Sequence, residues 1–179
     1  MKVLAIIFDG FEEEEAVAPF ALLKRAGAEL DIASNTTTVR GTHNIYLSEI
    51  KLLNDINYKE YDCLVVPGGS GQYKNLCQST LAQNIIKYFS DNNKLLCGIC
   101  AAPVVFGKLG ILKGKNYTCF TSMNEDCGGI YHDKGVVKDG NIITSRSVAY
   151  SIEFAYEIIK ALFGEEKLNE VWKKIYYEK

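Results

Sequence analysis

The sequence predicts an α/β protein, a three-layer αβα sandwich with a mostly parallel sheet and a small hairpin. Two observations lead to this prediction. Short segments that are apolar throughout, such as Val3–Phe8 and Leu95–Ile99, are typical of strands buried on both faces. They alternate along the chain with amphipathic helical patterns, and a parallel sheet covered by helices on both sides satisfies that alternation.

The first half of the chain predicts two strands, a helix and a hairpin region. The apolar segment Val3–Phe8 stops at Asp9-Gly10, as a central parallel strand does. The helix ends at Gly27, a favourable C-cap, and Pro19 predicts a kink or a restart within it. In chain order, the elements are a strand over 3–8, a helix over 12–25, a strand over 29–33 and irregular or hairpin structure over 36–47.

The second half repeats the alternation of strand and helix. Cys63–Val66 stops at Pro67-Gly68-Gly69, and Leu95–Ile99 runs directly into a helix that starts at Cys100. Asp139-Gly140 predicts a type I′ hairpin. In chain order, the elements are a strand over 63–66, a helix capped by Ser79, a strand over 95–99, a helix over 100–106, a weaker strand over 117–120, hairpin strands at 136–137 and 141–144, and two closing helices with apolar stripes over 152–162 and 168–175.

Length and composition indicate a single domain over residues 1–179. Hydrophobic residues make up 47% of the chain and charged residues 23%, which excludes disorder and low complexity. The net charge of −2 supplies no basic field for nucleic acid or an anionic membrane, so we expect a small-molecule or protein partner. The apolar run after Lys2 is too short for a signal peptide or a membrane span, so we expect a cytoplasmic location with reduced thiols.

Cys100 is the strongest candidate for a catalytic residue. Ligands bind beyond the carboxyl ends of parallel strands, and Cys100 lies at such an end, where a strand turns at once into a helix. This is the geometry of a nucleophile elbow, and we expect the first N–H groups of the helix to stabilise a thiolate and lower the thiol pKa. The alternative interpretation is a buried structural cysteine.

A run of four glutamates, Glu12 to Glu15, opens the first helix. Carboxylates are favourable at a helix N-terminus, so a solvated acidic face accounts for most of them. Glu15 shares the helix side that faces the sheet, from which it could reach Cys100. An ionised Glu15 would repel a thiolate, whereas a protonated one would donate a hydrogen bond, and burial favours the protonated form.

Other residues complete or close the expected site. Gly68 and Gly69 let backbone N–H groups approach an oxyanion. Thr144-Ser145-Arg146, at the end of the hairpin, either closes the site or caps the next helix. His43 and His132 are expected in surface loops rather than as catalytic bases.

No cofactor or metal is expected from the motifs present. Cys97 and Cys100 form a CxxC pattern, but Cys97 lies within a strand and the offset places the two side chains on opposite faces, so we expect no disulfide between them. A zinc site lacks a second CxxC, and the sequence contains neither a GxGxxG nor a P-loop pattern.

Taken together, these motifs resemble the ThiJ/PfpI superfamily, in the branch of the Parkinson-disease protein deglycase (DJ-one type), over nearly the whole chain. The resemblance implies a flavodoxin-like fold of the class I glutamine amidotransferase type, usually in a homodimer. It implies an easily oxidised nucleophile at Cys100, a hydrogen bond to it from Glu15, and backbone donors at Gly69 and Ala101. The segments that carry it are 9–15, 25–27, 66–69, 98–103, 139–146 and 153–154.

Two departures narrow the implied chemistry. Some members place a histidine where this chain has Phe120, so mechanisms that need that histidine are not expected, and Phe120 instead becomes a candidate for closing the site. The protease branch has a histidine directly after its cysteine, whereas this chain has Ala101. A protease or a Cys-His amidotransferase is therefore disfavoured.

The expected function is a cofactor-independent enzyme that acts on reactive carbonyls, either methylglyoxal or its early protein adducts, as a glyoxalase III or protein deglycase does. Cys100 would attack the carbonyl with assistance from Glu15, and the partner would be a small carbonyl compound or a glycated protein. The alternative is an oxidative-stress sensor or redox-regulated chaperone in which Cys100 becomes a sulfinate. A third reading is an inactive scaffold that keeps the elbow for packing.

Overall fold

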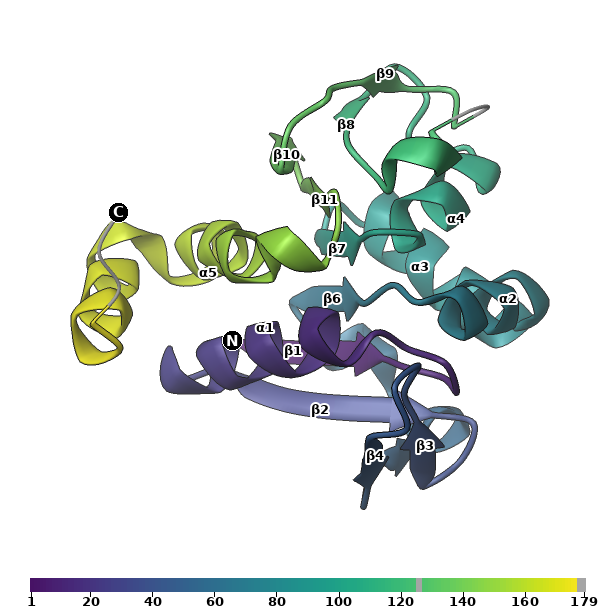
Figure 1. Ribbon diagram of the computed structural model, residues 1–179, viewed down its shortest axis with the longest axis horizontal. Coiled ribbons are helices and arrows are strands. Elements are labelled where there is room, and N and C mark those ends of the chain that lie inside the picture. Colours follow the sequence, from purple (N-terminus) through teal and green to yellow (C-terminus); the bar gives the residue numbers. More distant parts are fainter. Residues whose placement is uncertain (125–126, 177–179) are drawn as a thin grey trace.

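A seven-stranded sheet lies between two layers of helices in the computed structural model, which describes residues 1–124 and 127–176 (Figure 1). The strand order is β10-β11-β7-β6-β1-β2-β5, and every pair is parallel except β10 with β11. The predicted αβα sandwich is confirmed, and β1 is central as expected. The strands are β1 (Lys2–Ile6), β2 (Glu29–Ser34), β5 (Lys51–Leu52), β6 (Cys63–Val66), β7 (Leu95–Ile99), β10 (Val136–Asp139) and β11 (Ile142–Ser145).

Each face of the sheet is covered by its own set of helices. On one face, Phe20 of α1 and Phe154 of α5 pack against Val65 and other side chains of the strands. On the other face, helices α2, α3 and α4 bury residues such as Leu76 and Phe106 against the sheet. The helices are α1 (Glu13–Arg25), α2 (Ser70–Gln78), α3 (Thr80–Asp91), α4 (Ala102–Lys108) and α5 (Ser151–Lys174).

Several short elements lie outside the seven-stranded sheet. Two small two-stranded sheets are formed by β3 (Thr38–Arg40) with β4 (Tyr46–Ser48) and by β8 (Asn116–Tyr117) with β9 (Ile130–Tyr131). The first pair is antiparallel, which confirms a hairpin in the region predicted as irregular or hairpin. Four 3₁₀ turns in the described residues are η1 (Leu53–Asp55), η2 (Tyr58–Glu60), η3 (Thr121–Met123) and η4 (Val148–Tyr150).

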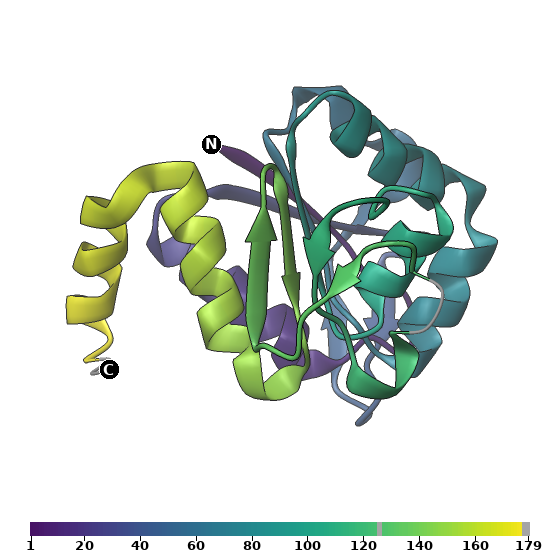
Figure 2. The ribbon, with the colours of Figure 1, turned by 90° about the horizontal axis from the view of Figure 1, so that it is seen from above.

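Several helix predictions are confirmed in detail. The Ser79 hydroxyl accepts a hydrogen bond from the Ala82 N–H, so Ser79 caps α3. Gly164 has a non-helical backbone, with φ 84° and ψ 173°, and divides α5 into the two closing helices that were expected. Figure 2 shows the second of these segments, in yellow, set at an angle to the first. In the part of the chain that the structure describes, no helix has both the length and the hydropathy that crossing a bilayer requires.

Three helices and strands differ from what the sequence predicted. Helix α1 continues through Pro19 as one helix, so of the two predicted outcomes the restart does not occur, although Pro19 leaves the Glu15 carbonyl without its usual N–H donor. Helix α2 was not predicted, because apart from Leu76 its buried residue is the polar Gln72. The weak strand over 117–120 is reduced to β8, which ends at Tyr117.

The hairpin between β10 and β11 has a different turn from the predicted type I′. Asp139 pairs with Ile142, so the loop residues are Gly140 and Asn141. A type I′ turn needs positive φ at both loop residues, but only Gly140 has one, at 60°. Positive φ at the first loop residue alone is typical of a type II′ turn, which also suits the right-handed twist of the strands.

Candidate active site

Cys100 occupies a strained turn between β7 and α4. Its φ of 63° lies in the left-handed region, which costs a residue other than glycine about 1–3 kcal/mol. The Cys100 N–H donates to the Ser145 carbonyl at 2.9 Å, and the Cys100 carbonyl accepts from the Phe120 N–H at 2.9 Å. These two bonds hold the strand-to-helix elbow that the sequence predicted.

Glycines allow three chain segments to meet at this elbow. A Cβ on Gly68 would lie 2.5 Å from Glu15 Oε2 and 2.6 Å from the Cys100 Cβ. A Cβ on Gly98 would lie 2.6 Å from the ring of Phe106 in α4. Since real side chains essentially never approach so closely, Gly68 is required for Glu15 and Cys100 to be neighbours.

Glu15 is buried beside the cysteine, with a relative exposure of 1%. Its Oε2 accepts the Gly68 N–H at 2.9 Å, and its carboxyl group is hydrogen-bonded to the Cys100 thiol. Burial raises the pKa of Glu15 to about 7, although the hydrogen bonds from Cys100 and from the Gly68 and Val148 backbone oppose this shift. Near neutral pH, Glu15 is therefore poised between its protonated and ionised forms.

The pKa of Cys100 is raised rather than lowered, contrary to the expectation from sequence. Burial is the largest cause, followed by the negative charge of Glu15 and the hydrogen bond to it, while the Gly69 and Ala101 N–H groups act in the opposite direction. Helix α4 starts only at Ala102 and has seven residues, so its end cannot outweigh an adjacent carboxylate. Near neutral pH, a thiolate at this position therefore requires the proton to reside on Glu15.

The three predicted backbone N–H donors have different acceptors: two face Cys100 and one faces Glu15. The N–H groups of Gly69 and Ala101 point to the Cys100 sulfur. The Gly68 N–H, which the sequence placed among the oxyanion donors, is instead taken by the Glu15 carboxyl group. Two of the three predicted donors, Gly69 and Ala101, therefore face the Cys100 sulfur.

A pocket of about 290 Å³ opens above Cys100. Phe120, 43% exposed, forms part of its wall, as proposed from sequence. Arg146 does not line this pocket: its Nε donates to Thr121 Oγ1 at 3.0 Å and its guanidinium forms an ion pair with Asp133, which anchors the loop that carries Phe120. The lining residues are Glu12, Thr42, Gly69, Ser70, Cys100, Ala101, Phe120 and Met123.

The glutamate run is less exposed than the sequence indicated. Only Glu14 is exposed; Glu12 is half-buried, and Glu13 and Glu15 are buried. Glu13 holds the loop of the β3–β4 hairpin, because its carboxylate accepts the N–H groups of His43 at 2.7 Å and Ile45 at 3.3 Å. The predicted solvated acidic face is therefore wrong for most of the run.

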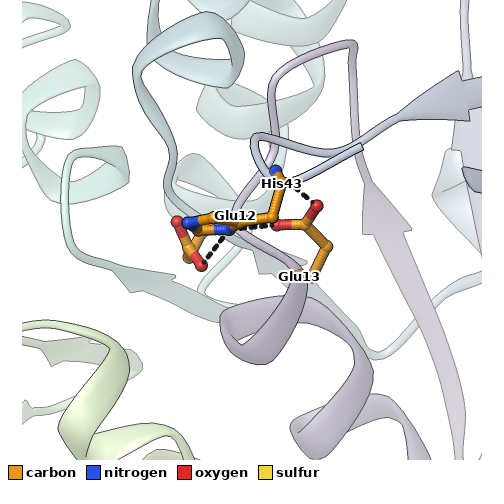
Figure 3. Close-up of side chains that lie close together, drawn as sticks. All are labelled: Glu12, Glu13 and His43. Carbon is orange, nitrogen blue, oxygen red and sulfur yellow. Dashed lines mark hydrogen bonds and ion pairs between the residues drawn. The ribbon is translucent and has the colours of Figure 1, made fainter. Parts of the chain in front are cut away.

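The two histidines have different surroundings. Figure 3 shows the Glu12 and Glu13 carboxylates turned toward His43, whose Nδ1 lies 3.4 Å and 2.9 Å from them respectively. The His43 side chain is 66% exposed, as expected for a loop residue. His132 is half-buried, and its Nε2 lies 2.7 Å from Asn116 Oδ1, beside a different pocket.

Glu12, Glu13 and His43 could in principle bind a cation, since their ligand atoms lie within 4.8 Å of one another. However, the Glu13 carboxylate already accepts the backbone N–H groups of His43 and Ile45 and is hydrogen-bonded to the His43 Nδ1. Their geometry is that of a structural contact between α1 and the hairpin, and we assign no metal to it.

None of the other five cysteines lines this pocket. Cys97 lies 3.8 Å from Cys63 on the neighbouring strand, sulfur to sulfur, and both are buried. Burial raises the pKa of Cys97 well above its ordinary value. All six cysteines are free thiols, so the CxxC pattern forms no disulfide.

Sequence reasoning did not identify four lining residues, Glu12, Thr42, Ser70 and Met123. Ser70 directly follows Gly68-Gly69, and that adjacency was a usable signal. Thr42 reaches the pocket because its N–H donates to the Phe11 carbonyl at 2.8 Å, a contact between segments that no local pattern reveals.

The fold and this site define a class of α/β sandwich proteins with a cysteine on a strained strand-to-helix turn and a buried glutamate hydrogen-bonded to it. Residues 1–161 match the family model of the DJ-1/PfpI family. The chain therefore belongs to the DJ-1/PfpI family, which confirms the resemblance found in the sequence.

Individual relatives agree with this assignment. An uncharacterized protein of Methanocaldococcus jannaschii is 35% identical over 94% of this chain and 84% of its own. The crystal structure of Drosophila melanogaster DJ-1beta has a TM-score of 0.92 and 33% identity, covering 99% of this chain and 98% of that one. The structure of oxidized Toxoplasma gondii DJ-1 has a TM-score of 0.93 and 28% identity, covering 99% of both chains.

Proposed function

We propose that this protein is a cofactor-independent enzyme that converts reactive carbonyl compounds such as methylglyoxal, or their early adducts on proteins, to hydroxy acids. The observation that carries this proposal is the hydrogen-bonded pair of Cys100 and Glu15 beside an open pocket, with the pKa of Glu15 raised to about 7. This pair offers a nucleophile and a proton carrier matched to neutral pH.

The first step forms a covalent adduct. With the proton on Glu15, the Cys100 thiolate attacks the aldehyde carbon of methylglyoxal, and the electron pair of the C=O bond moves to its oxygen. The N–H groups of Gly69 and Ala101 stabilise this oxyanion, which takes the Glu15 proton to give a hemithioacetal.

The later steps regenerate the enzyme. Ionised Glu15 removes the hydrogen on the former aldehyde carbon as a proton and returns it to the neighbouring carbon, while the hydroxyl proton moves to the ketone oxygen. The product is a thioester of lactate on Cys100. Water then attacks the thioester carbonyl while ionised Glu15 takes one of its protons, and the C–S bond breaks to release lactic acid, whose carboxyl proton goes to solvent. This restores the Cys100 thiolate and protonated Glu15.

Replacing the nucleophile tests the proposal directly. Cys100→Ser should lower lactate formation from methylglyoxal by about 10³-fold or more, because a hydroxyl at this position has no thiolate to attack with. Cys77→Ser is the matched control, since Cys77 is half-buried in α2 and lines a different pocket. Undiminished lactate formation by Cys100→Ser would eliminate the proposal.

Redox sensing is a second candidate. A solved relative, Toxoplasma gondii DJ-1, is described as oxidized. In this chain, two successive peroxide molecules would each transfer one oxygen to the Cys100 sulfur and leave as water, and protonated Glu15 would donate a hydrogen bond to the sulfinate. Mass spectrometry after mild peroxide should find two added oxygens at Cys100 first; uniform oxidation of the six thiols would contradict this role.

A further inference from the structure

The pocket above Cys100 presents negative charge. In the described part of the chain, Glu12 is the one lining residue whose side chain carries a formal charge at neutral pH when Cys100 is a thiol. Arg146, which directly follows β11, is engaged by Thr121 and Asp133 and does not line the pocket. A ligand that enters the pocket therefore meets a carboxylate without a compensating lysine or arginine in the wall.

Glu12 is fixed in place by the backbone. It is the N-cap residue of α1, yet its side chain forms no capping hydrogen bond, so the carboxylate is not turned back onto the helix. Its N–H donates to the Gly68 carbonyl at 3.0 Å, which joins it to the loop beside Cys100. The side chain is 19% exposed, so its charge acts in a medium less polar than bulk water.

His43 places a titratable positive charge next to this carboxylate. Buried Glu13 accepts both the backbone N–H and the Nδ1 of His43, which holds the ring 3.4 Å from Glu12 (Figure 3). The hydrogen bond to Glu13, together with the charges of Glu12 and Glu13, raises the pKa of His43 above its ordinary value, which favours the protonated, positively charged form of the ring. Its charge partly offsets that of Glu12.

We propose that Glu12 selects substrates by charge: it lets uncharged carbonyl compounds reach Cys100 and disfavours those that carry a carboxylate or phosphate, while His43 moderates this selection. The substrate class rests on the carbonyl chemistry proposed above, whereas the charge selection itself does not. Like charges at short range in a partly buried site repel strongly enough to change a reaction rate severalfold.

Two alkylating reagents measure this selection at the cysteine itself. Iodoacetamide is neutral and iodoacetate is anionic; with each, the Cys100 thiolate forms a C–S bond and iodide leaves with the electrons of the C–I bond. Because both react with the same thiolate, the ratio of their rates cancels changes in the Cys100 pKa. This matters because the charge of Glu12 also raises the pKa of Glu15.

At pH 6.5, Glu12→Gln should raise the ratio of iodoacetate to iodoacetamide rates by about 3–10-fold, as expected for removal of one nearby like charge. His43→Gln should lower the ratio, because it removes the opposing positive charge. Glu14→Gln is the matched control: it neutralises an exposed glutamate of the same run that does not line the pocket, and should change the ratio by less than about 2-fold.

An unchanged ratio in Glu12→Gln, or failure of both reagents to modify Cys100, would overturn the proposal. The enzymatic counterpart compares methylglyoxal with 4,5-dioxopentanoate, a 2-oxoaldehyde that carries a carboxylate and can undergo the same conversion to a hydroxy acid. Wild type should turn over methylglyoxal much faster than the compound with the carboxylate, and Glu12→Gln should reduce the ratio of the two rates. If wild type turns over neither compound while the alkylation ratio still responds to Glu12→Gln, the proposed activity fails and the charge selection stands.

Discussion

The pKa of Cys100 depends on the charge of Glu15, and the pKa of Glu15 depends on its hydrogen bond to Cys100. Glu15 is held near a pKa of 7 by burial, and its ionised form raises the pKa of Cys100. The two groups therefore titrate as one unit, in which the first proton to leave can come from either residue. The reactive state of the cysteine is the one in which Glu15 keeps the proton.

Alkylation of Cys100 by iodoacetamide should show this coupling. In wild type, we expect the rate to rise with an inflection at or below about pH 7, to level off, and to rise again above the ordinary thiol range when the second proton leaves. Glu15→Gln has no second titrating group, so a single rise should replace the two. Stopped-flow or mass-spectrometric rates from pH 5 to about 11 provide the measurement.

A single wild-type inflection at the pKa of an ordinary thiol, unaffected by Glu15→Gln, would contradict the coupling. The motif would then be structural, and the enzymatic proposal would lose its nucleophile.

At the scale of elements, the site depends on how closely three chain segments approach one another. The end of β6, the first turn of α1 and the elbow between β7 and α4 meet around Gly68. The Gly68 N–H bonds to Glu15 and its carbonyl accepts the Glu12 N–H. Gly68 therefore contacts both Glu15, which is hydrogen-bonded to Cys100, and Glu12, which lines the pocket.

Gly68→Ala should disturb both stability and reactivity. The added methyl group would overlap Glu15 and Cys100, so we expect a loss of about 1–3 kcal/mol in the free energy of unfolding, measured in urea. The alkylation rate of Cys100 should change as well. Gly110→Ala is the control: Gly110 has φ +79° but open space around it, so it should lose about 1 kcal/mol from backbone strain and leave Cys100 alkylation unchanged.

At the scale of the whole molecule, the parallel sheet brings the carboxyl ends of β1, β6 and β7 to one edge, and α1 crosses from there with Glu15 inside. The fold therefore buries an ionisable group in its own core. The pKa of Glu15 is higher in the folded than in the unfolded chain, so its protonation stabilises the fold at low pH, and this contribution is lost as pH rises toward 7.

Unfolding measurements should detect that loss between the ordinary glutamate pKa of 4.5 and about 7. Across this window we expect wild type to lose about 3 kcal/mol of stability through Glu15, because one pKa unit corresponds to about 1.4 kcal/mol. Glu15→Gln should lose much less. Urea titrations at pH 5 and pH 7.5 compare the two proteins; parallel losses in both would assign the pH dependence to other groups such as His43.

Much of this architecture is determined by local sequence patterns. The apolar segments specify buried strands, the stripes of α3 and α5 specify covering helices, and an abrupt change from strand to helix places Cys100 at an elbow. These features depend on residues close together in the chain, so periodicity and turn chemistry predict them.

Only the tertiary structure decided which partners the site residues take. The Gly68 N–H donates to Glu15, Arg146 forms an ion pair with Asp133, and His43 lies beside Glu12. The tertiary structure also raised the pKa of Cys100, which local helix geometry had been expected to lower. Hydrogen-bond partners and pKa values depend on burial and on charges from distant segments, and a pattern within one segment carries no information about either.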